Sequence, residues 1–258
     1  MSGTRPLRRA APMRDPASTA FPLAAGPVIR DLPSPNQDDR PEGMPIDMLI
    51  LHYTGMQTGQ AAVDRLRDPE AKVSSHYVVM EDGEVLRLVP EARRASHAGI
   101  SYWRGHTALN ARSIGIEIVN PGHEWGYRPF PALQMAAVAD LCLEILARHP
   151  IPARNVIAHS DIAPDRKQDP GEFFDWEGLA KLGIGLWPEA PTETVPADEA
   201  RALEGLAAIG YPVAPERPGL ALAAFQRHWR QSLVNGTADA ETCAVIEAVR
   251  RLAVTETP

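Results

Sequence analysis

Two short apolar runs in this chain each end in a histidine. His52 follows Met48–Leu51, and His159 follows Val156–Ala158. Short apolar runs are typical of strands buried inside a sheet, so both imidazoles are expected at the ends of buried strands. Asp169 lies ten residues beyond the second histidine. Taken singly, such histidines are most often hydrogen-bonded residues and such an aspartate a solvated loop acid. Together they match the three ligands of catalytic zinc, which keeps a fourth position open for water.

The segments between these runs predict further strands and helices. Asp82-Gly83 separates residues 76–80 from 85–89, which is a strong hairpin signal. A helix is predicted over residues 60–67, where Pro69 follows as a stop. Strands and helices therefore alternate along this part of the chain.

Residues 114–119 alternate with the period of a strand. The three isoleucines face one side, so Glu117 points to the other. A helix from Pro131 to near Arg148 then leads to the strand that ends at His159. The pattern predicts an α/β fold, with a mixed central β-sheet flanked by helices.

Composition changes divide the chain into four parts. Residues 1–33 are expected to be a flexible N-terminal extension, 34–188 the main domain, 189–198 a polar linker and 199–255 a small three-helix domain. Apolar residues at helical spacing define the three short helices.

Charge and composition exclude several classes of protein. The net charge of -7 argues against a nucleic-acid surface, and no stretch approaches the roughly 18 apolar residues of a membrane span. Cys142 and Cys243 lack the spacing of a thiolate metal site and are expected to be buried small side chains. We expect a monomer.

The N-terminus is a poor export signal. Residues 20–29 lack a continuous apolar segment, and Asp15 follows the Arg8-Arg9 pair too closely for twin-arginine export. The cytoplasm is the predicted compartment, and the periplasm is the alternative.

Five motifs occur in one order along the main domain. They are Leu51-His52-Tyr53-Thr54, Ser74-Ser75-His76-Tyr77-Val78, Ser113-Ile114-Gly115-Ile116-Glu117, Ala158-His159-Ser160-Asp161-Ile162-Ala163 and Arg166-Lys167-Gln168-Asp169-Pro170-Gly171. In this order they resemble the type 2 N-acetylmuramoyl-L-alanine amidases, whose fold is shared with peptidoglycan-recognition proteins. The resemblance covers roughly Ser34 to Pro188.

The resemblance implies roles for five residues. His52, His159 and Asp169 would bind one Zn²⁺ per chain, Glu117 would be the general base, and Lys167 would stabilise the oxyanion. Without the resemblance, Glu117 would be interpreted as a salt-bridged strand residue and Lys167 as a surface residue.

The remaining histidines are weaker candidates. His97 lies where the family has a substrate-groove motif, and Trp103 and Asn110 follow on the next loop, so all three are predicted to bind substrate. His76 is expected to be structural. Solvated positions are expected for His106, His123, His149 and His228.

The small C-terminal domain resembles the three-helix peptidoglycan-binding domain. The matching segments are Leu206–Tyr211, Ala224–Arg227 and Asn235–Asp239. The resemblance implies a module that raises the local concentration of the enzyme on the cell wall. The alternative is a structural appendage packed on the main domain.

The predicted activity is hydrolysis of the amide between the lactyl group of N-acetylmuramic acid and L-alanine of the stem peptide, in peptidoglycan turnover or muropeptide recycling. The predicted partners are peptidoglycan or muropeptide fragments. A non-catalytic peptidoglycan-recognition protein is the main alternative. A zinc peptidase is weaker, because the chain has no HExxH helix.

Overall fold

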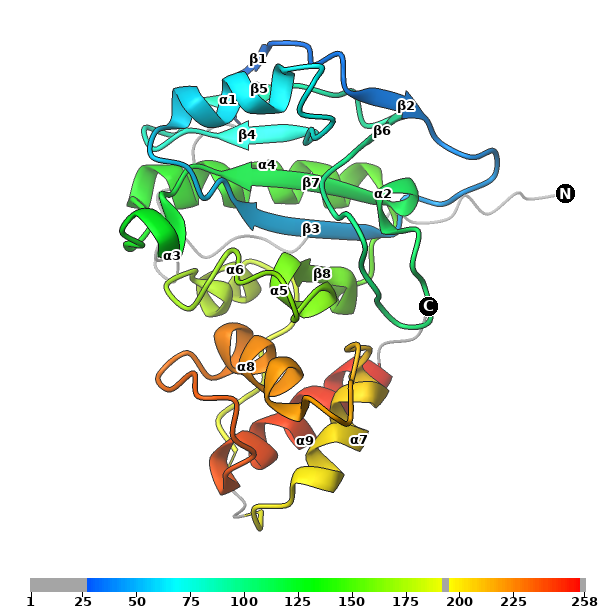
Figure 1. Ribbon diagram of the computed structural model, residues 1–258, viewed down its shortest axis with the longest axis vertical. Coiled ribbons are helices and arrows are strands. Elements are labelled where there is room, and N and C mark those ends of the chain that lie inside the picture. Colours follow the sequence, from blue (N-terminus) through cyan, green and yellow to red (C-terminus); the bar gives the residue numbers. More distant parts are fainter. Residues whose placement is uncertain (1–26, 192–194, 256–258) are drawn as a thin grey trace, which may run out of the picture.

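The computed structural model describes residues 27–191 and 195–255 (Figure 1). The strands are β1 Ile29–Asp31, β2 Gln37–Asp39, β3 Met48–Tyr53, β4 Tyr77–Val79, β5 Val85–Arg87, β6 Arg93–Ala95, β7 Ser113–Ile118 and β8 Val156–Ala158. The helices are α1 Gly59–Arg67, α2 Leu109–Arg112, α3 Gly122–Trp125, α4 Ala132–Arg148, α5 His159–Ile162, α6 Trp176–Lys181, α7 Glu199–Ile209, α8 Pro218–Trp229 and α9 Ala240–Thr255, with a 3-10 turn at Ala153–Asn155.

Six strands form the central sheet, in the order β1-β5-β4-β7-β3-β8. The predicted hairpin β4-β5 is antiparallel, and the other neighbouring pairs are parallel. A separate antiparallel pair joins β2 and β6. The predicted mixed sheet is thus confirmed, and the parallel strands β3, β7 and β8 end at one edge.

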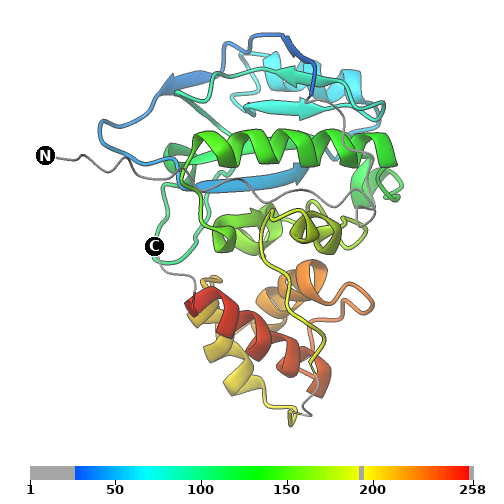
Figure 2. The ribbon, with the colours of Figure 1, turned by 180° about the vertical axis from the view of Figure 1, so that it is seen from behind.

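Helices cover both faces of this sheet. The long helix α4 crosses one face (Figure 2). Ile114, Ile116 and Ile118 of β7 pack in the same buried cluster as its apolar side chains. On the other face, α1 packs Val63 and Leu66 against the hairpin. The predicted alternation of β7 follows from this arrangement, because one side of the strand faces α4 and the other faces the site described below.

Helices α7, α8 and α9 form the C-terminal module, and α8 lies next to α5 (Figure 1). In the described ranges, the module shares its buried core with the main domain. Ile50, Ile157 and Ile162 of the main domain belong to the same buried cluster as Leu206 and Phe225 of the module. Apolar packing therefore joins the two predicted domains into one body.

The described part of the chain begins with the short strand β1. The predicted extension over residues 1–33 is too long, because Ile29–Asp31 pairs with β5. Residues 1–26, with the Arg8-Arg9 pair, lie outside the described residues.

Both cysteines are buried and free, as expected. Within the described ranges, no helix combines the length and the apolarity needed to cross a membrane.

Candidate active site

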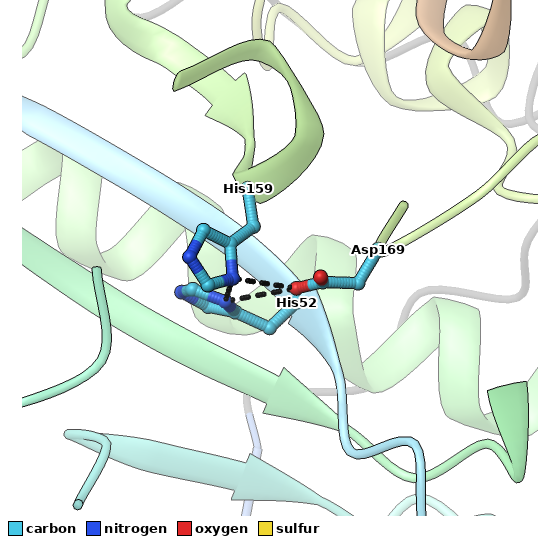
Figure 3. A group of neighbouring side chains, drawn as sticks. All are labelled: His52, His159 and Asp169. Atoms are coloured by element: carbon cyan, nitrogen blue, oxygen red, sulfur yellow. Dashed lines mark hydrogen bonds and ion pairs between the residues drawn. The ribbon is translucent and has the colours of Figure 1, made fainter. Parts of the chain in front are cut away.

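His52, His159 and Asp169 converge, although up to 117 positions separate them in sequence (Figure 3). Nδ1 of His52 lies 2.9 Å from Nδ1 of His159 and 3.1 Å from Oδ2 of Asp169. The third side of the triangle, from His159 Nδ1 to Asp169 Oδ2, measures 2.9 Å. All three residues are buried.

Strand ends bring the three residues together. His52 lies near the end of β3, and His159 follows the last residue of the neighbouring parallel strand β8 as the first residue of α5. The N–H of Ser160 donates to the carbonyl of Asp169 at 2.9 Å, which fixes the loop carrying the carboxylate against α5. The carboxyl ends of parallel strands share one edge, so the sequence pattern brings these groups to one place.

A chain of hydrogen bonds fixes which nitrogen of His52 carries its proton. The Ser113 hydroxyl donates to the Leu109 carbonyl at 2.6 Å, so Ser113 accepts from Nε2 of His97 at 3.1 Å. His97 then has a lone pair on Nδ1, which accepts from Nε2 of His52 at 3.0 Å. His52 therefore carries its proton on Nε2, and Nδ1 offers a lone pair to the triangle.

His159 is oriented in the same way. Its Nε2 lies 3.2 Å from the carbonyl of Ala98 and donates to it, so Nδ1 is again the unprotonated nitrogen. The triangle then holds two nitrogen lone pairs and a carboxylate oxygen, with no proton to share between them. Three such atoms at this separation repel one another unless a cation lies among them, and this donor set suits Zn²⁺.

Burial sets the charges of these groups. Burial and the neighbouring His159 lower the pKa of His52 to about 4, so its imidazole is neutral at neutral pH. Burial alone would raise the pKa of Asp169, but the interactions with His159 and His52 outweigh it and lower this pKa well below its ordinary range. The site thus presents a neutral imidazole at His52 and a carboxylate at Asp169, and both are protonation states that metal binding needs.

Glu117 lies beside the triangle for a reason of register. In the β3-β7 pairing it is directly opposite His52, so both side chains leave the same face of the sheet. Its Oε2 is buried with no hydrogen-bond partner among the described residues. Burial and the charge of Asp169 raise the pKa of Glu117 well above its ordinary value, while Lys167 lowers it. A carboxylate held this way is a strong candidate proton acceptor.

A cavity of about 650 Å³ opens over these groups. Glu117, His159, Lys167 and Asp169 all line it. The positive charge of Lys167 acts on both Glu117 and His52, lowering the pKa of each. The cavity therefore combines a possible cation site, a proton acceptor and a fixed positive charge, which is the set of groups that amide hydrolysis needs.

The three predicted substrate residues have different surroundings. His97 lines the cavity, but both of its ring nitrogens bond to protein atoms. Oδ1 of Asn110 accepts from the backbone N–H groups of His97 and Ala98, so it shapes the loop that carries this histidine. Trp103 is 2% exposed and packs against Tyr211 of the C-terminal module, away from the described lining of the cavity.

The motif Ser113–Glu117 has a glycine, Gly115, at its centre because a side chain there would clash with His97. A Cβ atom at this position would lie 2.5 Å from the ring of His97. The histidine can therefore reach His52 only because β7 has no side chain there. His76, predicted to be structural, is fully buried, and its Nδ1 accepts from the N–H of Gly115 at 3.0 Å.

Three of the histidines expected in solvent form specific contacts. His123 lines the cavity and pairs with Glu172 at 3.1 Å, and His149 pairs with Glu91 at 2.6 Å. His228 is 2% exposed and bonds to Asp161, so its predicted solvation is wrong. The sequence signal that could have identified it is the adjacent tryptophan, Trp229, which marks a buried stretch of α8.

Comparisons with known proteins agree with this geometry. The family model for N-acetylmuramoyl-L-alanine amidase matches residues 42–172. The amidase AmiD of Escherichia coli K12 is 42% identical over 229 residues, which is 79% of this chain and 82% of AmiD. The 1,6-anhydro-N-acetylmuramyl-L-alanine amidase AmpD of the same organism is 35% identical, over 57% of this chain and 87% of AmpD.

Two solved structures are similar to this chain in both fold and sequence. AmiD in complex with anhydro-N-acetylmuramic acid-L-Ala-D-gamma-Glu-L-Lys superposes with a TM-score of 0.74 and 41% identity, covering 82% of this chain and 91% of that one. AMPDH3 of Pseudomonas aeruginosa in complex with anhydromuramic pentapeptide has a TM-score of 0.74 and 32% identity, over 82% and 94%. The chain belongs to the N-acetylmuramoyl-L-alanine amidase family of hydrolases.

Proposed function

We propose that this protein is a zinc-dependent amidase that cleaves the bond between the lactyl group of N-acetylmuramic acid and L-alanine of the stem peptide. His52, His159 and Asp169 would hold the single Zn²⁺. When bound, the cation would polarise the scissile carbonyl and make water more acidic. The observation that carries this proposal is the proton-free triangle beneath a cavity that is also lined by Glu117, whose Oε2 has no partner in the described part of the chain.

Glu117 is proposed as the proton carrier. Its unpartnered Oε2 can accept a proton from the attacking water and then deliver it to the nitrogen of the departing L-alanine. The pKa of Glu117 is already raised by burial, which makes the carboxylate a better base than a solvated glutamate. A cation in the triangle would counter part of this rise.

Lys167 is proposed to stabilise the negative charge that develops on the carbonyl oxygen. It lines the same cavity as Glu117, two positions before Asp169 in the chain. A fixed positive charge in a site that excludes water is worth several kcal/mol to a transition state of this kind. No step requires the lysine to gain or lose a proton.

The substrate class is proposed from the cavity and from the relatives. AmiD and AMPDH3 were solved with anhydromuramic peptides, and the cavity here is large enough for a sugar and the first residues of a peptide. We therefore propose anhydromuropeptides as substrates, in peptidoglycan recycling. The cytoplasm stays the predicted compartment and a monomer the predicted state; cell fractionation and light scattering would test them.

Mass spectrometry of digested muropeptides tests the activity. The amidase should release a free stem peptide that begins with L-alanine and leave a carboxylate on the lactyl group. A peptidase would instead shorten a peptide that remains attached to the sugar. A recognition protein would bind the muropeptide and return it intact. Either of the last two results would reject the proposal, and chelator should abolish the expected cleavage.

A further inference from the structure

The C-terminal module holds a buried carboxylate that follows the metal-ligand histidine by two positions. Asp161 is fully buried in α5. Its Oδ1 accepts from the hydroxyl of Tyr211 at 2.7 Å, and its Oδ2 accepts from Nδ1 of His228 at 2.6 Å. Both donors belong to the module, so a main-domain carboxylate is bound mainly by side chains from the other part of the protein.

The same carboxylate organises the backbone around His159. Oδ2 of Asp161 also accepts from the N–H of Ala158 at 2.9 Å, which closes the turn between β8 and α5. The N–H of Ala163 donates to the carbonyl of His159 at 3.1 Å, and the N–H of Ser160 donates to the carbonyl of Asp169 at 2.9 Å. The position of Asp161 therefore influences the backbone of two of the three proposed ligands.

The donors themselves are held firmly. The ring of His228 stacks on Trp176 of α6 and on Trp229. The distances between ring centroids are 3.9 Å to Trp176 and 4.0 Å to Trp229. The hydroxyl of Tyr211 accepts from Nε1 of Trp229 at 3.0 Å. Buried aromatic rings that stack on one another have little freedom to move, so the two donors present fixed hydrogen bonds to Asp161.

We infer that Tyr211 and His228 are positioning residues of the active site, which hold α5 through Asp161 and so fix His159 and Asp169 for metal binding. The inference rests on the proposed metal-binding function of these two ligands. It gives the module a structural role in the catalytic centre, whether or not the module also tethers the enzyme to the cell wall. A carboxylate cap that loses its partners becomes a costly buried group, and the turn that it closes should open more often.

The test uses the full chain with one donor removed at a time. Tyr211→Phe and His228→Phe each keep an aromatic ring and remove one hydrogen bond to Asp161. Ile246→Val is the matched control, because Ile246 is a buried residue of α9 that packs against Gly205 of α7 and cannot bond to a carboxylate. All three variants should unfold at lower temperature than the wild type.

Hydrogen exchange of the Ser160 and Ala163 amides in metal-free protein is the deciding measurement. Both amides should exchange about tenfold faster in the two donor variants, because the loss of a supporting contact typically has an effect of this size. In Ile246→Val they should exchange at the wild-type rate. Zinc affinity, measured by chelator competition well below the unfolding temperature, should fall by a similar factor in the donor variants only.

Unchanged exchange in Tyr211→Phe and His228→Phe would overturn the inference, because the interface would then only join the two parts. Failure of the wild type to bind zinc would instead overturn the proposed function. The exchange measurement would still decide in that case whether the module orders α5, so the two failures are distinguishable.

Discussion

Replacing Glu117 with glutamine is expected to make the metal-free protein more stable and the loaded enzyme nearly inactive. The buried carboxylate has one oxygen without a partner among the described residues, and burial and the charge of Asp169 raise the pKa of Glu117 well above its ordinary value. The neutral amide of glutamine avoids this unfavourable charge with little change of shape.

The sign of the stability effect follows from the raised pKa. Below the ordinary pKa of a glutamate the group is protonated in both folded and unfolded states, so it adds no pH-dependent cost. As the pH rises above that value, the unfolded chain loses its proton more readily than the folded protein, and the wild type becomes less stable. Leaving a buried polar group without a partner costs about 1–3 kcal/mol, and more when the group is charged, so the glutamine variant should gain on the order of 1 kcal/mol or more at neutral pH.

The activity effect has the opposite direction. A positioned general base contributes about 10²- to 10⁴-fold, so turnover of a soluble muramoyl peptide by the zinc-loaded variant should fall by about 10² or more while zinc stays bound. Thermal unfolding of chelator-treated protein between pH 4 and 8 measures the stability. Glu124→Gln is the control, because it changes an exposed carboxylate of the same cavity. Wild-type turnover in Glu117→Gln, or a lower melting temperature at neutral pH, would refute the reasoning.

Three further substitutions have distinct expected outcomes. His97→Ala removes the acceptor for Nε2 of His52 and should weaken zinc binding by about tenfold or more in chelator competition; unchanged affinity would contradict the proposed tautomer. Lys167→Met should lower turnover by about 10² with zinc content unchanged, and equal turnover would exclude the lysine from the chemistry. Burial raises the pKa of Glu91, but bonds from its arginine, tyrosine and histidine neighbours outweigh this and lower it to about 2. The low pKa stabilises the folded protein above pH about 4.5, and this stabilisation is lost toward pH 2. Because solvent screens this half-buried carboxylate, Glu91→Gln should cost about 2 kcal/mol in denaturant unfolding at neutral pH, less than the full shift implies, and little near pH 2. A cost that does not change with pH would contradict this pKa.

The sequence could predict the core of the site because strand geometry determines it. His52 and His159 end parallel strands that are neighbours in the sheet, and the period of β7 decides which way Glu117 points. These are local patterns that pairing then converts into proximity. The hairpin and the long helix α4 were predictable for the same reason.

The contacts of the C-terminal module could not be predicted in this way. A helix that packs on one neighbour shows a single apolar stripe, but α8 packs on its own module and on α5 and α6 as well. His228 therefore lies in a second buried face that periodicity does not reveal. The sequence predicts Trp103 in a substrate groove, and nothing local to this residue indicates that its ring packs against Tyr211.

The sequence does not reveal the edge strand β1 either. It has three residues, and its pairing with β5 joins segments 56 positions apart, as in the bond of Arg87 with Asp31. So short a run has too few alternating positions to signal a strand.

Metal content per chain tests the central claim most directly, namely that His52, His159 and Asp169 bind one divalent cation. Purified wild-type protein and the His159→Ala and Asp169→Ala variants would be equilibrated with zinc, dialysed and analysed by mass spectrometry of the metal. We predict one zinc per wild-type chain and loss of most zinc from both variants, with their circular dichroism unchanged, because two ligands hold zinc poorly against water. Stoichiometric zinc in His159→Ala would contradict the account.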